Sequence, residues 1–130
     1  MAAGTEMTDV RKVMTEQLIT VEPSTSVAAA VTVMGMQGVG AVLVMQKGRL
    51  DGIFTERDLV RAMSNDIGAS SQPVSQWMTP NPVTVGPDAS VEDALEIMLA
   101  GHFRHLPVME GERLVGVVSI RDLSRATLRE

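Results

Sequence analysis

Apolar positions recur at helical spacing in two stretches of the chain, residues 27–34 and 91–98. In each stretch they fall at i, i+3, i+4 and i+7, which is the spacing of an amphipathic helix with one buried face. Ser26 and Ser90 immediately precede these stretches, and a serine hydroxyl commonly caps the first turn of a helix. We therefore predict one such helix in each half of the chain.

Short aliphatic runs follow each of these helices and predict two strands joined by a turn that contains glycine. The predicted strands are residues 41–45, 50–54, 106–109 and 114–118. Their almost continuous apolar character suggests burial on both faces. An extended piece precedes each helix at residues 18–21 and 82–85, and a closing helix begins at Thr55 or Ser119. Each half therefore has the order β-α-β-β-α, which indicates an α/β fold.

The two halves are copies of one unit. A shift of 64 residues aligns them without a gap and pairs Met14-Thr15 with Met78-Thr79 and the Arg-Asp-Leu at 57–59 with that at 121–123. One copy has too little apolar surface to enclose its own core, so we expect the two to pack sheet against sheet with pseudo-twofold symmetry. The predicted divisions are a tail (1–9), repeat 1 (10–63), a polar connector (64–72), repeat 2 (73–126) and a tail (127–130).

Composition excludes several classes of protein. The 130 residues include no cysteine, so neither a disulfide framework nor a thiolate metal site is expected. A formal net charge of −5 disfavours binding to nucleic acid or to anionic membranes. Residues 1–6 lack the features of a signal peptide, and no apolar stretch approaches the roughly 20 residues that span a membrane. We expect a cytoplasmic protein.

The most informative segment occurs twice, as GIFTERDL at 52–59 and GVVSIRDL at 116–123. Each copy places a hydroxyl, a guanidinium and a carboxylate at one helix start, namely Thr55, Arg57 and Asp58, and Ser119, Arg121 and Asp122. A hydroxyl residue followed three positions later by an acid is also a capping box, which needs no ligand. The same groups suit a nucleotide, because phosphate favours a helix N-terminus and a carboxylate accepts hydrogen bonds from ribose. Both interpretations remain open on the residues alone.

These features resemble the CBS domain family, named after cystathionine beta-synthase, whose members occur as tandem pairs called Bateman modules. The resemblance covers residues 10–126 and rests on the gapless duplication, on Thr-Val followed by Pro at each start, on the Leu-Pro-Val at 106–108 and on the two Gly-x-x-Thr/Ser-x-x-Asp segments. It implies a regulatory module that binds AMP, ADP or ATP, catalyses nothing, forms a homodimer and acts on a protein effector in trans. An S-adenosyl compound ranks lower, and whether Mg²⁺ accompanies ATP is left open. The alternative is a ligand-free interaction or dimerisation module.

The resemblance also implies roles for individual residues. Asp58 and Asp122 would accept hydrogen bonds from ribose, and Ile53 and Val117 would touch adenine. Residues near the phosphates would be Thr55, Arg57, Ser119 and Arg121. The remaining walls would come from Thr20, Thr84, Val39, Gly40, Ala41, Phe103, Arg104 and His105.

The two copies differ where Arg104-His105 in the second repeat aligns with Gly40-Ala41 in the first. The family resemblance implies that basic residues here reach the ligand phosphates. We therefore favour the Asp122 cleft, with Val39, Gly40 and Ala41 approaching from the other repeat, and expect the Asp58 cleft to be weak or empty.

Metal binding and catalysis are disfavoured by the same segment. His102 and His105 lie three residues apart, but no third nearby ligand accompanies them. Ser119 is better explained as a helix cap than as a nucleophile, because the histidines flank the start of a strand. We expect neither a metal site nor enzyme activity.

Overall fold

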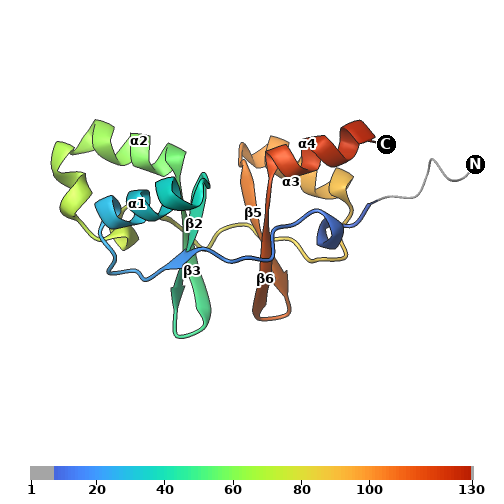
Figure 1. The fold of residues 1–130 in the computed structure, drawn as a ribbon, viewed down its shortest axis with the longest axis horizontal. Helices are drawn as coiled ribbons and strands as arrows, with labels where there is room; N and C mark the ends of the chain where they lie inside the picture. The colour runs from blue at the N-terminus through green and yellow to red at the C-terminus, as the bar shows by residue number, and fades with distance from the viewer. Residues whose placement is uncertain (1–7, 130) are drawn as a thin grey trace, which may run out of the picture. The chain divides into compact units, whose positions relative to one another are not determined.

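The computed structural model describes residues 8–129, so expectations for residues 1–7 and 130, including the absence of a signal peptide, lie outside the described residues. The chain divides into two compact units (Figure 1). One unit is Ile19–Pro82, and the other combines the described residues of Met1–Leu18 with those of Val83–Glu130.

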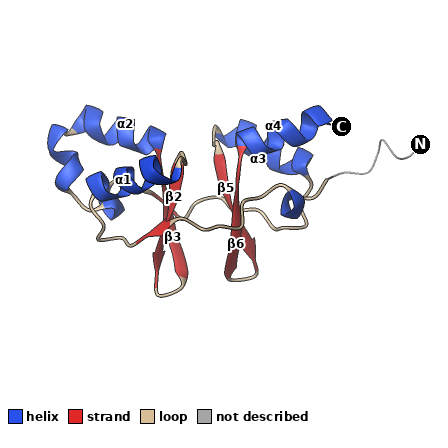
Figure 2. Cartoon of the chain, viewed as in Figure 1, coloured by secondary structure: helices blue, strands red, loops and turns tan. Residues whose placement is uncertain are grey.

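The unit Ile19–Pro82 is a four-stranded sheet with two helices. Its strands are β1 (Thr20–Val21), β2 (Ala41–Gln46), β3 (Arg49–Thr55) and β4 (Thr79–Pro80), in that order across the sheet. β1 pairs parallel with β2, whereas β2–β3 and β3–β4 are antiparallel. The helices α1 (Val27–Gln37) and α2 (Glu56–Asn65) lie on the same side of these strands (Figure 2).

The other unit repeats this arrangement with fewer regular strands. It contains α3 (Val91–Gly101), the hairpin β5 (His105–Glu110) and β6 (Arg113–Ser119), and α4 (Ile120–Arg129). Isolated bridges replace the outer strands: Val85 pairs in parallel with Val108, and Thr15 pairs antiparallel with Val117. The predicted helices and hairpins are thus confirmed to within a few residues.

Local hydrogen bonds explain where the first helix of each unit begins and ends. The Ser26 hydroxyl accepts a hydrogen bond from the Ala29 amide at 3.1 Å, and Ser90 does the same for Asp93 at 3.0 Å. Gly38 ends α1 in the left-handed conformation at φ 67°, which glycine adopts without a steric cost. The predicted serine caps are therefore confirmed.

The first residues of each repeat contact the other repeat. Val10 donates its amide to the Ala89 carbonyl at 2.8 Å, and Val74, 64 positions later, donates to Thr25 at 2.6 Å. Both valine side chains are fully buried, Val10 among residues of the second repeat and Val74 among residues of the first. The two copies have therefore exchanged their N-terminal segments, which the linear division into repeats did not anticipate.

This exchange accounts for the glycine that opens each repeated motif. A Cβ on Gly52 would lie 2.6 Å from Met78 Sδ and 2.8 Å from the Thr79 carbonyl oxygen. A Cβ on Gly116 would lie 2.6 Å from Met14 Sδ and 3.0 Å from the Thr15 carbonyl oxygen. Each exchanged segment crosses its strand so closely that only glycine fits without a shift.

Three expectations need correction. The segment 64–72, predicted as a connector without buried structure, includes the end of α2 and the 3-10 helix Ile67–Ser71, with Ala69 fully buried. The extended piece at 82–85 forms no strand, and only Val85 pairs there, in a single bridge with Val108. α4 continues to Arg129, into the predicted tail at 127–130.

The apolar residues form one core cluster in each unit. Phe54 and Met98 are among the largest fully buried side chains, one in each cluster. Burial on both faces is seen in the middle of β2, where three consecutive residues are buried, whereas buried and half-buried residues alternate along most of β6. No helix in the described range 8–129 is long and apolar enough to cross a membrane.

Candidate ligand site at the two helix starts

The start of α2 is a complete capping box. Thr55 is the N-cap, and its hydroxyl oxygen accepts a hydrogen bond from the Asp58 amide at 3.2 Å. Asp58 Oδ2 in turn accepts hydrogen bonds from the Thr55 amide at 2.9 Å and from the Thr55 hydroxyl at 3.1 Å. The capping interpretation of the motif is therefore correct, and one carboxylate oxygen of Asp58 serves the helix start.

The start of α4 has the same geometry. Ser119 accepts a hydrogen bond from the Asp122 amide at 3.1 Å, and Asp122 Oδ2 accepts from the Ser119 amide at 3.0 Å and from the Ser119 hydroxyl at 2.9 Å. Both aspartates thus stand at the third helical position, with one oxygen committed to the cap and the other directed elsewhere.

The second oxygen distinguishes the two aspartates. Asp58 Oδ1 accepts a hydrogen bond from the Thr79 hydroxyl at 3.2 Å and lies 3.5 Å from Arg61 Nη2. Asp58 is buried, whereas Asp122 is half-buried. Within residues 8–129, Asp122 Oδ1 makes no hydrogen bond or ion pair. The Asp122 carboxylate therefore has one oxygen without a hydrogen bond or ion pair from residues 8–129.

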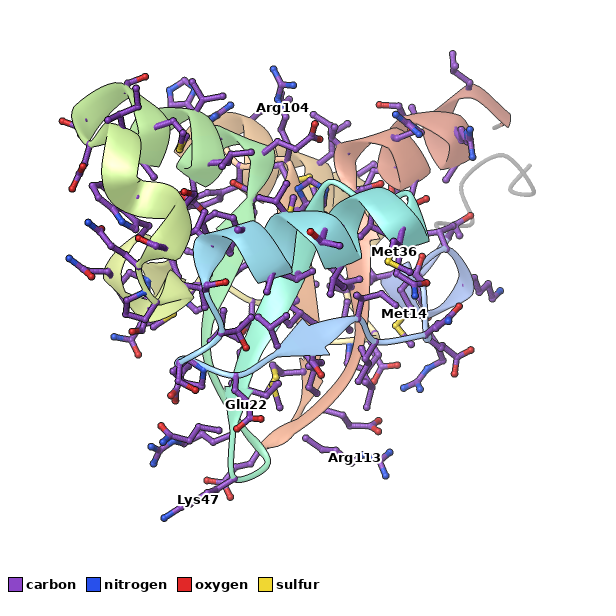
Figure 3. The ribbon with its side chains drawn as sticks, turned by 60° about the vertical axis from the view of Figure 1, so that its left-hand side comes forward. Met14, Glu22, Met36, Lys47, Arg104 and Arg113 are labelled. Atoms are coloured by element: carbon purple, nitrogen blue, oxygen red, sulfur yellow. The ribbon has the colours of Figure 1, made fainter. Side chains whose placement is uncertain are left out.

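Basic residues lie beside the start of α4. The Ile120 amide donates to the Arg104 carbonyl at 2.8 Å, and His105 is paired with Ser119 in the β5–β6 register. Arg104 is exposed, and its side chain projects away from the ribbon (Figure 3). Gly40 makes the equivalent backbone contact in the first repeat, to Glu56 at 3.1 Å, but contributes no charge. The structure thus brings Arg104, His105, Ser119 and Asp122 to one place.

The other predicted residues divide by their exposure. Ile53 is buried in β3 opposite Leu43, whereas Val117 is half-buried in β6 opposite Pro107. The Phe103 side chain packs against the core of its unit, where a Cβ on Gly101 would collide with its ring. Arg57, Arg121, Thr20 and Thr84 are exposed, and Val39, Gly40 and Ala41 are half-buried.

Four contributors to the Asp58 environment were not identified from the sequence. Thr79 and Arg61 contact the carboxylate, the Trp77 ring contacts Arg61, and Gln72 accepts a hydrogen bond from the Trp77 indole. The duplication carried one usable signal, because Met78-Thr79 repeats Met14-Thr15. Nothing in the linear order showed which repeat these dipeptides contact. Among residues 8–129, no group of three or more His, Cys, Asp or Glu side chains is placed to hold a metal ion.

The chain matches the CBS domain family model over residues 10–65 and 74–129. An uncharacterised 17.7 kDa protein of Acidianus ambivalens is 42% identical over 124 residues, covering 93% of this chain and 74% of the relative. Each matched segment corresponds to one of the two repeats seen in the sequence, which accounts for almost the whole described chain.

Solved structures give the same result. The CBS-domain protein ATU1752 from Agrobacterium tumefaciens superposes with a TM-score of 0.88 at 38% identity, covering 92% of this chain and 99% of that one. CBSX2, solved in complex with AMP, superposes with a TM-score of 0.80 at 29% identity, covering 93% and 96% of the two chains. The predicted α/β class is confirmed, and this chain belongs to the CBS domain family as a tandem pair of CBS domains.

Proposed function

We propose that this chain is a regulatory module whose second repeat binds an adenine nucleotide, AMP, ADP or ATP, at the start of α4. It carries out no catalysis and acts on a partner protein in trans. The observation that carries the proposal is the Asp122 carboxylate, whose Oδ1 keeps its acceptor capacity while Oδ2 is fixed by Ser119. CBS-pair proteins are typically regulatory, and the similar protein CBSX2 was solved with AMP.

The groups at this helix start match the parts of a nucleotide. Asp122 Oδ1 accepts hydrogen bonds from the ribose hydroxyls, and its position is set in advance by the capping box. Arg104 and Arg121 supply positive charge and hydrogen-bond donors to the phosphates, and His105 lies beside them on β5. The half-buried Val117 on β6 offers an apolar surface to the base. The approach of Val39, Gly40 and Ala41 from the other repeat stays a prediction.

A single strong site follows from the difference between the repeats. The first repeat has Gly40 and Ala41 where the second has Arg104 and His105, so it cannot contribute the same charges to a phosphate. Its Ile53 is also buried, whereas the equivalent Val117 is half-buried. These differences favour one bound nucleotide per chain. That the chain forms a homodimer and acts on an effector protein stays a prediction.

Calorimetric titration tests the proposal. AMP, ADP, ATP and S-adenosylmethionine are titrated into protein freed of carried-over nucleotide, with and without Mg²⁺, and melting temperatures are recorded in parallel. We expect one site per chain, and a stabilisation of about 2.7 kcal/mol at a hundredfold excess of ligand over its Kd.

Two variants and two matched controls assign the site. Asp122→Asn should weaken nucleotide binding by about tenfold to a hundredfold, because it removes a charged acceptor, whereas Asp93→Asn on the exposed part of α3 should not. Arg104→Ala should weaken AMP but not adenosine, and Arg113→Ala should affect neither. No binding of any nucleotide to folded protein would contradict the proposal and support the ligand-free interaction module.

A further inference from the structure

In the first repeat, the Asp58 carboxylate already has donors from within the chain. Asp58 Oδ1 receives the Thr79 hydroxyl at 3.2 Å and the Arg61 guanidinium at 3.5 Å, and its side chain is only 9% exposed. We propose that Thr79 and Arg61 take the place of a ligand's hydroxyl donors and close the first repeat to nucleosides, so that they decide which repeat binds. This inference rests on the proposed function, which assigns the open carboxylate to the second repeat.

Arg61 is held in this position by an aromatic residue. Its guanidinium carbon lies 5.7 Å from the centroid of the Trp77 ring, and its Nη2 donates to the Trp77 carbonyl at 2.5 Å. Such cation–π contacts restrain an arginine side chain that would otherwise sample many rotamers. Trp77 therefore acts as a positioning residue for Arg61 and, through it, for Asp58.

Further hydrogen bonds fix Trp77 itself. Its indole Nε1 donates to Gln72 Oε1 at 2.7 Å, and Gln72 Nε2 donates to Asp66 Oδ2 at 2.8 Å. The hydrogen bond from Gln72, followed by that from the Gly68 amide, lowers the pKa of Asp66. A continuous chain of polar contacts thus runs from Asp66 to Asp58, all within the unit Ile19–Pro82.

The second repeat has the same residue types around its carboxylate but not the same contacts. Thr15 and Arg125 align with Thr79 and Arg61, yet neither makes a hydrogen bond or ion pair with Asp122 within residues 8–129. The aligned partner of Trp77 is Val13, which has no aromatic face to hold an arginine. The difference between a closed and an open carboxylate therefore begins at positions 77 and 13.

Closure has a direct consequence for affinity. A ribose diol could reach Asp58 Oδ1 only after displacing the Thr79 hydroxyl and the Arg61 guanidinium. Each hydrogen bond to a charged group is worth about tenfold to a hundredfold in a binding constant. The nucleoside would exchange its own hydrogen bonds for one hydrogen bond from Thr79 and one ion pair with Arg61, so net binding at the first repeat is weak.

Adenosine is the appropriate probe, because it carries the diol without the phosphates, to which Gly40 and Ala41 offer no charged side chain. Equilibrium dialysis measures adenosine binding in an Asp122→Asn background, where binding at the second repeat is weakened. Adding Thr79→Val and Arg61→Met should raise the adenosine binding constant at least about tenfold, to one site per chain. The matched control adds Thr15→Val and Arg125→Met to the same background and should produce no gain. Trp77→Val alone should give part of the gain, and Trp77→Phe, which keeps a ring, should give less.

A separate measurement avoids the risk that the opened variants fail to fold. Asp58→Asn in the otherwise unchanged chain should leave adenosine and AMP affinity within about twofold of wild type, because the closed repeat does not contribute to binding. A loss of affinity in Asp58→Asn, two equivalent sites in wild type, or folded opened variants without a gain would each overturn the inference. If wild type binds no adenosine or nucleotide, the proposed function fails, but binding by Thr79→Val/Arg61→Met in the otherwise unchanged chain would still support closure. Its absence there would overturn closure as well.

Discussion

The close crossing of the exchanged segments over β3 and β6 makes Gly52→Ala a sharp test of the fold. The added methyl carbon would lie 2.6 Å from Met78 Sδ, 3.1 Å from Met78 Cγ and 2.8 Å from the Thr79 carbonyl oxygen. The thioether could turn away, but the carbonyl belongs to β4, which pairs with β3 directly at this position. The backbone of one strand must therefore move.

Two opposing contributions decide the sign of the effect. Replacing glycine by alanine restricts the unfolded chain and by itself stabilises a protein by about 0.4–1 kcal/mol. Inserting a methyl group into a filled site costs about 1–3 kcal/mol. The collision is with backbone, so we expect the second contribution to prevail, with a net loss of about 1–2 kcal/mol.

Urea denaturation measures this loss as a lower midpoint at unchanged slope. Gly35→Ala is the matched control, because a Cβ at this position on α1 meets nothing within 4 Å and helix propensity predicts a gain of about 1 kcal/mol. Gly116→Ala should reproduce the loss in the other unit, where Met14 and Thr15 cross. Equal stabilisation by Gly52→Ala and Gly35→Ala would show that no segment crosses above β3.

Two further predictions concern burial and pH. Val10→Ala and Val74→Ala should each lower the free energy of unfolding by about 2–3 kcal/mol, because each side chain is fully buried, whereas the exposed Val83→Ala should change it by less than about 0.5 kcal/mol. A negligible effect of Val10→Ala would show that the exchanged segment does not complete the second core. Hydrogen bonds in the folded state lower the pKa of Asp66 from its ordinary value of 3.8. The charged carboxylate therefore stabilises the folded protein at pH values above 3.8, and this stabilisation is lost as the pH falls through the folded-state pKa. Urea denaturation from pH 7 down to pH 2.5 measures the difference in free energy of unfolding between wild type and Asp66→Ala. We expect this difference to persist at neutral pH and to narrow only below about pH 3.8. A difference that already narrows at pH 6 would refute the assignment.

The sequence by itself determined the elements whose hydrogen bonds are local. The gapless duplication, the serine caps of α1 and α3, and the capping boxes at Thr55 and Ser119 all involve partners within a few residues. Such contacts leave a readable spacing, so the positions of Asp58 and Asp122 at the third residue of each helix could be predicted. The two hairpins followed for the same reason, since each joins neighbouring aliphatic runs.

Tertiary structure alone decided which repeat each N-terminal segment contacts and how the two carboxylates differ. The dipeptides Met14-Thr15 and Met78-Thr79 are identical, so pairing with either copy satisfies the sequence equally well. Asp58 is closed by Thr79, 21 residues away, and that contact exists only because the exchange brings β4 beside β3. A contact between distant positions leaves no periodic trace in a single sequence, because its free energy depends on the fold that brings the two residues together.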